Sequence, residues 1–172
     1  MRGLFGTGLA VSKWAGLACV GLLAACGGAS ADVTGTAGGV DFDKTKYVFF
    51  GGPFVIISML EIDCEDLDYV KRNYEIGQAP TDSETKLLQF SYDPDALVEG
   101  SFPVAIDAAI SASVVSVAGG AFYESIATGG LFTVESISEE DSASGVFEGL
   151  QFDDGALDGS FDAVWCRNLK AR

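Results

Sequence analysis

The stretch VFEGLQFDDGALDGSFDAVWC, at residues 146–166, restricts the fold more than any other part of the sequence. Asp154-Gly155 suits a two-residue type I′ turn, in which both central residues need positive φ. Pairing around that turn sets Phe152 opposite Leu157 and leaves a nearly clean division between two faces. The apolar face would hold Val146, Leu150, Phe152, Leu157, Phe161, Ala163 and Trp165, and the polar face Gln151, Asp158, Ser160 and Asp162. The sequence therefore predicts a two-faced antiparallel hairpin.

Other segments between residues 41 and 172 also have strand character. Aromatic and β-branched residues are concentrated in short runs bounded by glycine or proline, at residues 46–50, 54–62, 87–92, 111–118, 121–128 and 131–137. The run 54–62 is apolar at nearly every position, which indicates a strand covered on both faces or the centre of a sandwich. Residues 64–86 are polar and charged, and we expect a long surface excursion with at most a short helical turn. We therefore predict an all-β domain over residues 41–172.

Two Gly-Gly pairs predict how three of these segments connect. Gly119-Gly120 and Gly129-Gly130 suit tight turns, so residues 111–137 resemble a meander of three strands. The second turn would set Glu124 opposite Glu135, and like charges across a strand pair repel. Either the register shifts there or that face of the sheet is solvated.

The first 25 residues are a separate unit. Arg2 and Lys13 are their only charges, and residues 14–25 are all apolar or glycine. A positive start followed by an apolar run of this length is typical of a secretory signal peptide. The alternative, a transmembrane or buried helix, is disfavoured because spanning a bilayer needs roughly 20 apolar residues, and Lys13 interrupts the run.

Leu23-Ala24-Ala25-Cys26 resembles the lipobox of bacterial lipoproteins. The resemblance implies that the Cys26 sulfur receives a diacylglycerol, that the signal is cleaved between Ala25 and Cys26, and that the new amine is acylated, for example with palmitate. Two or more acyl chains give stable membrane anchoring. Cys19 would be removed with the signal. The resemblance implies a protein held by lipid in the bacterial cell envelope, and Gly27, where aspartate often marks inner-membrane retention, favours the outer membrane.

Residues 27–40, GGASADVTGTAGGV, offer few side chains that can pack. We predict that residues 26–40 are the lipidated cysteine followed by a flexible tether, with a reach of roughly 20 Å. The predicted organisation is thus a signal peptide (1–25), a tether (26–40) and a β-rich domain (41–172).

Two cysteines remain in the exported part of the chain, Cys64 and Cys166. Thiols in an oxidising compartment usually pair, so we predict a disulfide between them. It would close a loop of about 100 residues and stabilise the domain by roughly 4–5 kcal/mol in the loop-entropy model. A redox-active pair is the alternative, but the close C-x-x-C spacing is missing. Strict alternation places Cys166 on the polar face of the hairpin, so pairing would need a bulge or a bend at the end of the strand.

The sequence contains no histidine, and 25 acidic residues outnumber 10 basic ones. The first fact excludes histidine-based catalysis and imidazole metal ligands. Without residues 1–25 the formal charge becomes −17, because Arg2 and Lys13 are lost. Such a charge argues against nucleic acid as a partner and against lying flat on an anionic membrane. It favours a solvated acidic surface, and the alternative is capture of cations or of a basic partner.

Clusters of acidic and aromatic residues suggest weaker candidate sites. Calcium favours carboxylate oxygens, but the acidic spacing near the hairpin does not match a calcium loop, and we predict no metal and no cofactor. The acidic groups are Asp153, Asp154, Asp158 and Asp162; Glu139, Glu140 and Asp141; and Glu61, Asp63, Glu65, Asp66 and Asp68 around Cys64. Phe122, Tyr123 and Phe132 could line a ligand cavity, although aromatic residues at strand spacing more often form a core.

The end of the chain carries a second, weaker resemblance. Gly159, Phe161, Ala163 and Cys166 form a G-x-F-x-A-x-x-C pattern similar to the last strand of many small exported bacterial lipoproteins. The resemblance implies an antiparallel β-sandwich or flattened barrel closed by a disulfide, and it implies no activity.

These observations lead to one favoured function and two alternatives. We expect a non-enzymatic envelope domain anchored to the membrane through Cys26, which binds an envelope protein or has a structural role. One alternative is a carrier of small apolar ligands with a lipocalin-like cavity. The other is a histidine-free hydrolase with paired carboxylates. An apolar cavity, two carboxylates facing one cleft, or a filled core with an exposed apolar patch would distinguish the three.

Overall fold

The computed structural model describes residues 29–42, 45, 47–60, 62–65, 67, 85–92, 97–118 and 121–169. Apart from a short helical turn near Cys64 and a 3₁₀ helix near the C-terminus, the regular structure of these residues is β-strand. The predicted all-β class is therefore confirmed. The elements are β1 (Ser30–Ala37), β2 (Val40–Asp41), β3 (Tyr47–Gly51), β4 (Phe54–Ser58), β5 (Thr85–Tyr92), β6 (Gly100–Pro103), β7 (Ile110–Ala118), β8 (Ala121–Ile126), β9 (Gly129–Ser138), β10 (Ser142–Phe152), β11 (Gly155–Trp165) and η1 (Arg167–Leu169).

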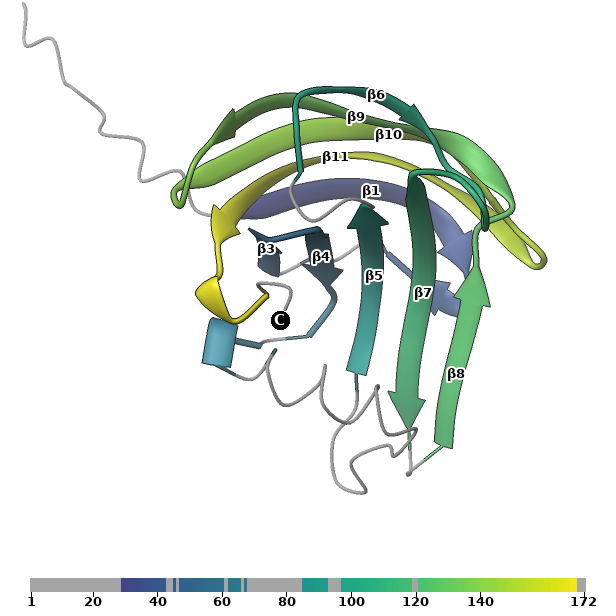
Figure 1. The fold of residues 1–172 in the computed structure, drawn as a ribbon. Helices are drawn as coiled ribbons and strands as arrows, with labels where there is room; N and C mark the ends of the chain where they lie inside the picture. Colours follow the sequence, from purple (N-terminus) through teal and green to yellow (C-terminus); the bar gives the residue numbers. More distant parts are fainter. Residues whose placement is uncertain are drawn as a thin grey trace, which may run out of the picture.

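The strands form one curled sheet with the shape of a half-barrel (Figure 1). Its main path runs β6-β9-β10-β11-β3-β4-β5-β7-β8, and β1 and β2 branch from β11. β11 is the junction, because residues 156–162 pair with β1 whereas Val164 and Trp165 pair with β3 in parallel. The sheet therefore divides into an upper half (β1, β2, β6, β9–β11) and a lower half (β3–β5, β7, β8).

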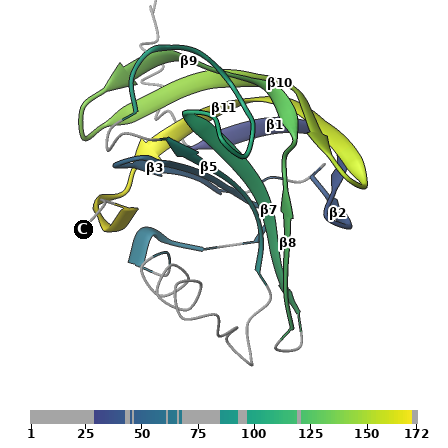
Figure 2. The ribbon, with the colours of Figure 1, turned by 45° about the vertical axis from the view of Figure 1, so that its right-hand side comes forward.

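Side chains fill the space between the two halves, which curl toward each other in Figure 2. Phe90, from the lower half, lies 4.3 Å from Phe132 and 5.3 Å from Phe147 between ring centroids, and both of these rings come from the upper half. Phe132 also stacks on Phe161 at 5.5 Å. Aromatic rings at these separations contribute packing energy beyond their buried area. The centre of the half-barrel is therefore an aromatic core.

The two-faced hairpin is present as β10 and β11, but its turn differs from the prediction. Phe152 pairs with Gly155, so Asp153-Asp154 are the central residues of the turn, and none of Asp153, Asp154 and Gly155 has positive φ. A turn without positive φ tolerates aspartate, and a type I′ turn is not needed. A Cβ atom on Gly155 would collide with the backbone oxygen of Thr36. The sequence pattern assigns Gly155 to the turn, but the residue is a glycine because β1 approaches it closely.

A bulge changes which residues of the hairpin face the core. The register of β10 against β11 shifts between Phe147 and Leu150, and Gly149 at the shift has a φ of 58°. One extra residue in a strand reverses the alternation beyond it. Phe147 is therefore buried in place of the expected Val146, which is half-buried.

The other positions of the hairpin keep the side that alternation predicts. Leu150, Phe152, Leu157, Phe161 and Ala163 are buried in the core. Trp165 is half-buried and packs against the same core, with its ring 5.1 Å from that of Phe50 between centroids. The four predicted polar residues, Gln151, Asp158, Ser160 and Asp162, are all exposed.

Residues 30–41 are not a flexible tether, contrary to the prediction for 26–40. β1 pairs with β11 from Ser30 to Thr36, and β2 pairs back on β1. Val33 and Ala37 are buried in the core. The small residues that resemble a linker thus form a strand, and small side chains permit close packing against β11. The β-rich domain therefore extends back to at least Ser30.

The predicted meander is only half correct. β7 and β8 form the expected hairpin, with Val117 opposite Phe122. β9 does not pair with β8; it begins at Gly129 and pairs with β10 and β6. The chain crosses from the lower to the upper half through Ala127 and Thr128, whose amides bond to Ala112 and Gln151. Glu124 and Glu135 therefore lie in different halves, and the expected repulsion between them does not arise.

β4, the strand at the start of the apolar run 54–62, is covered on both faces, as predicted. β4 ends at Ser58, and Val55 and Ile57 point into the main core. Ile56 points to the opposite side of the sheet, where a second cluster forms. This outer cluster contains the buried residues Phe49, Ile56, Leu67, Leu87, Val115, Cys166 and Leu169.

Two glycines of the β10–β11 hairpin lie beneath phenylalanine rings. Gly145 pairs with Phe161, and Gly159 pairs with Phe147. A Cβ atom on Gly159 would collide with the backbone oxygen of Asp32 and lie 2.6 Å from the Phe147 ring. Aromatic rings across glycines let strands bend and approach closely.

We predict that Gly159→Ala destabilises the domain by about 1–3 kcal/mol, because overpacking forces backbone and ring to move. Urea unfolding followed by intrinsic fluorescence measures the change. Gly129→Ala is the matched control, because a Cβ atom on Gly129 would have nothing within 4 Å and its φ is not positive. Equal stability of the two variants would contradict the proposed role of Gly159.

Candidate functional site

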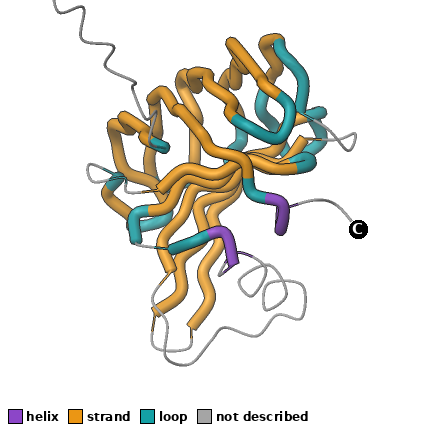
Figure 3. The backbone as a smooth tube through the Cα atoms, turned by 90° about the vertical axis from the view of Figure 1, so that its left-hand side faces the viewer, coloured by secondary structure: helices purple, strands orange, loops and turns teal. Residues whose placement is uncertain are grey.

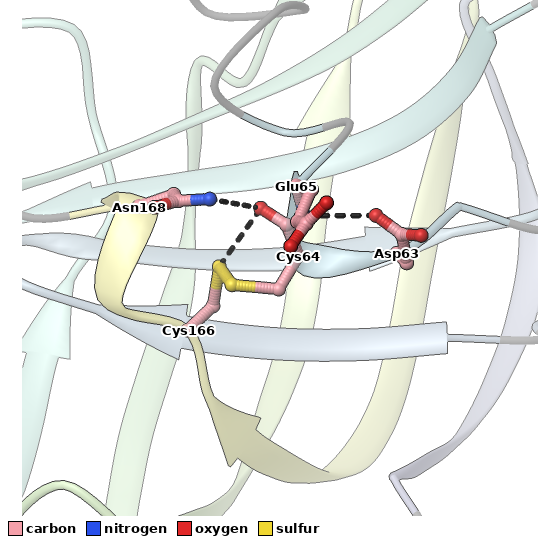
Figure 4. The surroundings of a disulfide bond; sticks show 5 residues. All are labelled: Asp63, Cys64, Glu65, Cys166 and Asn168. Carbon is pink, nitrogen blue, oxygen red and sulfur yellow. Dashed lines mark hydrogen bonds between the residues drawn. A yellow bond between two sulfur atoms is a disulfide. The ribbon is translucent and has the colours of Figure 1, made fainter.

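Cys64 and Cys166 lie at disulfide distance, as the sequence predicts, with their Cα atoms 5.5 Å apart (Figure 4). Cys166 is fully buried in the outer cluster and follows the last residue of β11, and its amide bonds to the oxygen of Phe50. The strand thus ends before Cys166, which resolves the conflict with strict alternation. Cys64 lies in a short helical turn rather than on an extended strand.

Hydrogen bonds fix the two chain segments that the disulfide joins. The side-chain amide of Asn168 donates to the oxygen of Cys64 at 2.9 Å, and the Asp63 carboxylate accepts from the amide of Glu65 at 2.8 Å. Figure 3 shows the two short helical segments close together on one side of the strands. These two segments form a cover over the outer cluster. The disulfide holds the cover in place, so its role is structural.

The predicted lipidation site cannot be placed in the fold. Cys26, Ala25 and the rest of residues 1–28 lie outside the described residues. Within the described residues, no helix is long and apolar enough to cross a membrane.

The acidic residues around Cys64 do not form a visible catalytic pair. Asp63 and Glu65 are exposed, and Glu61, Asp66 and Asp68 lie outside the described residues. Where the structure describes side chains, the only buried polar ones are Ser58 and Ser113. No carboxylate of the described residues is therefore buried away from water.

Two aspartates of the hairpin stabilise turns. The Asp154 carboxylate accepts hydrogen bonds from the amides of Gly38 (2.9 Å) and Gly39 (3.2 Å), which have positive φ in the β1–β2 turn. The Asp158 carboxylate accepts from the amide of Gly149 at the bulge (2.6 Å). Carboxylates bound to amides in this way clamp one turn onto another.

The acidic groups do not assemble into a metal site within the part of the chain that the structure describes, where no three His, Cys, Asp or Glu side chains gather. Glu139, Glu140 and Asp141 are exposed in the β9–β10 turn, where Glu140 has a φ of 55°. Asp153 and Asp162 are exposed as well.

The three aromatic residues that could line a cavity have different environments. Phe132 is fully buried in the aromatic core. Phe122 and Tyr123 lie on β8 and are 38% and 62% exposed. A groove of about 410 Å³ runs beside Tyr123, between the β7–β8 hairpin and the turn clamped by Asp154. It is lined by Gly38, Val114, Ser116, Tyr123, Glu124, Ser125 and Asp154.

β8 is the strongest candidate for a binding surface. It is the last strand of the main path, and among the described residues it pairs only with β7. Five of its six residues are exposed, and Phe122, Tyr123 and Ile126 are three of the six exposed large apolar residues in the described part of the chain. Sheet edges are usually protected by charged side chains, proline or a bulge, and AFYESI contains no lysine or proline and one charged residue, Glu124.

The distribution of charge along the sequence also indicates this surface, although no short sequence motif marks it. From Leu87 to Cys166 the chain contains no lysine or arginine, so every charged side chain of this long stretch is acidic. β6 to β11 all lie within it. Among the described residues, the strands of the upper half of the sheet and β7 and β8 therefore carry no basic side chain.

Comparison with protein-family models, with curated protein sequences and with solved structures found no match.

We predict that the double variant Cys64→Ser, Cys166→Ser loses about 2–5 kcal/mol of folding free energy, because the unfolded chain is freed and the cover of the outer cluster loosens. Urea unfolding measures the loss, and a dithiol reductant should cause a similar loss in the unchanged protein. Cys19→Ser is the matched control. Unchanged stability of the double variant would contradict the structural role.

Proposed function

We propose that this chain is a lipid-anchored protein of the bacterial cell envelope with a non-enzymatic binding role. The Leu23-Ala24-Ala25-Cys26 motif after an uncharged apolar run supports export, cleavage before Cys26 and lipidation of its sulfur. The Cys64–Cys166 disulfide is consistent with an oxidising compartment. The outer membrane is the favoured location.

The observation that carries the binding role is the contrast between a filled core and an open sheet edge. Phe90, Phe132 and Phe147 occupy the centre of the half-barrel, where a carrier would need a cavity. Three of the six exposed large apolar side chains of the described residues, Phe122, Tyr123 and Ile126, lie on β8. An exposed apolar patch on an otherwise acidic surface is typical of a protein-binding site.

We further propose that the partner is an extended, basic segment of another envelope protein, which adds to β8 as a further strand. Main-chain hydrogen bonds to the edge would supply affinity, and Tyr123 with its groove would contact alternate side chains. The unbroken acidic stretch from Leu87 to Cys166 would attract lysine and arginine.

The two alternatives have less support. The grooves beside Tyr123 and beside Ala29 are open and partly polar, which suits a carrier of apolar ligands poorly. A carboxylate hydrolase needs two carboxyl groups across one cleft, and the described residues show no buried carboxylate.

Lipidation is tested by growing cells with a clickable fatty acid. We expect the unchanged protein to carry the label and Cys26→Ser to lose it, because the thioether cannot form without the thiol. Cys19→Ser should remain labelled, since residue 19 would be cleaved off. Label retained in Cys26→Ser would contradict the proposal.

The binding surface is tested with a photo-crosslinking amino acid at Tyr123 and, as the positional control, at Ser160 on the convex face. We expect crosslinks from position 123 to a basic segment identified by mass spectrometry, and few from position 160. Adding Ala121→Lys on β8 should abolish them through charge repulsion, whereas adding Ser160→Lys should leave most of them.

Two results would overturn this assignment. Crosslinks from position 123 that persist with Ala121→Lys would mean that β8 does not bind a basic strand. Strong protection from hydrogen exchange, in the isolated protein, of those β8 amides that point away from β7 would mean that the outer edge of β8 is already paired.

A further inference from the structure

We infer that the domain stands end-on on the bilayer, with the β9–β10 turn (residues 138–142) toward the lipid headgroups and the β8 groove away from them. The inference rests on the proposed lipidation of Cys26. It replaces the long flexible tether, which would leave the domain free to tumble, with a fixed orientation.

The covalent connection between lipid and fold is short. β1 begins at Ser30, so only Gly27, Gly28 and Ala29 separate it from Cys26. Four residue steps span at most about 14 Å even when fully extended. β10, with eleven residues, is roughly 35 Å long at about 3.3 Å per residue. The point where the chain enters the sheet is therefore held close to the headgroups, whereas the other end of the strands can be far from them.

The strand register shows which end of the sheet lies near the start of β1 and therefore near Cys26. Ser30 pairs with Asp162, and the neighbouring row of pairs joins Ser142 to Val164. A groove of about 430 Å³ brings Ala29 and Ser30 together with Ser136, Ser142, Ser144, Asp162 and Val164. β1 thus starts beside the β9–β10 turn, and in Figure 1 both lie at the left end of the upper half of the sheet.

The opposite end carries the groove beside Tyr123. The β1–β2 turn and the β10–β11 turn lie there, joined by the hydrogen bonds of Asp154 to Gly38 and Gly39. Gly38 and Asp154 also line the groove. In the end-on orientation this groove faces the aqueous compartment, where a partner segment can reach it.

Charge argues against the alternative in which the domain lies on its convex face. That face carries exposed Asp32, Glu148, Asp158 and Asp162, and β1 and β9–β11 contain no lysine or arginine. Anionic headgroups repel such a face, and among the described residues of β1 and β9–β11 a single exposed large apolar side chain, Leu131, offers little area to insert into the bilayer. The short connection alone keeps the near end at the membrane, against the charge of Glu139, Glu140 and Asp141.

The test uses the processed protein purified from membranes, with intact mass confirming the acyl chains, and reconstituted in phosphatidylcholine vesicles that contain a nitroxide-headgroup lipid. A fluorophore is attached to one introduced cysteine at a time. The sites are Glu139→Cys at the near end, Asp153→Cys at the far end and Ser160→Cys on the convex face. We expect the nitroxide to quench most fluorescence at position 139 and little at positions 153 and 160.

Two conditions sharpen the test. Ten Gly and Ser residues inserted between Gly28 and Ala29 add a reach of roughly 16–19 Å and should remove most of the difference between positions 139 and 153. Anionic lipid should reduce quenching at position 139 at low salt but not at high salt, because Glu140 and Asp141 would be repelled.

The outcomes separate this inference from the proposed function. A mass without acyl chains overturns both. In the lipidated protein, equal quenching at positions 139 and 160 shows a domain lying flat, and equal quenching at 139 and 153 shows a tumbling one. Either result overturns the end-on orientation and leaves the lipid anchor standing.

Discussion

The pairing of β11 with three other strands is the constraint on which the rest of the structure depends. Its residues 156–162 lie between β1 and β10, and its last two residues turn to β3 in the lower half. Cys166 follows at once and closes the disulfide to Cys64. One strand near the C-terminus thus joins the N-terminal strand, both halves of the sheet and the cover of the outer cluster. Contacts this distant in sequence carry a large loop-closure entropy cost, which slows the folding of such a topology.

The same strand explains how a chain with so much negative charge keeps a stable core. Acidic side chains of β11 and its neighbours point outward, where water solvates them, or accept backbone amides, as Asp154 and Asp158 do. The inward positions hold large aromatic rings seated over Gly145 and Gly159. Among the described residues of the upper half, charge is therefore confined to the outward positions and the turns. β8, in the lower half, carries three of the six exposed large apolar side chains of the described residues.

Local pattern is sufficient for the elements but not for their arrangement. Strands β3, β5, β7 and β10–β11 follow from runs of apolar and β-branched residues, and the cysteine pair follows from the expectation that Cys64 and Cys166 would pair in an oxidising compartment. The predicted position of the hairpin turn is wrong because Gly155 is required by the backbone of Thr36, a contact with a strand more than a hundred residues away. The inward place of Phe147 depends on the bulge at Gly149, which alternation alone does not reveal. The sequence predicts a tight turn at Gly129-Gly130, but the chain instead crosses between the two halves of the sheet at Ala127 and Thr128. A Gly-Gly pair is compatible with either arrangement.

The segment interpreted as a tether shows why composition misleads at the start of the β-rich domain. A segment made of glycine, alanine, serine and threonine does not form a packed core by itself, since these residues bury little apolar area. In β1 they need not build a core, because β11 supplies the partner strand and Val33 and Ala37 only fill the remaining space. Small residues then become an advantage, since the strand backbones approach closely at Gly155 and Gly159. The residues that resemble a linker in composition are therefore the first strand of the sheet, held by its partner strand rather than by a core of their own.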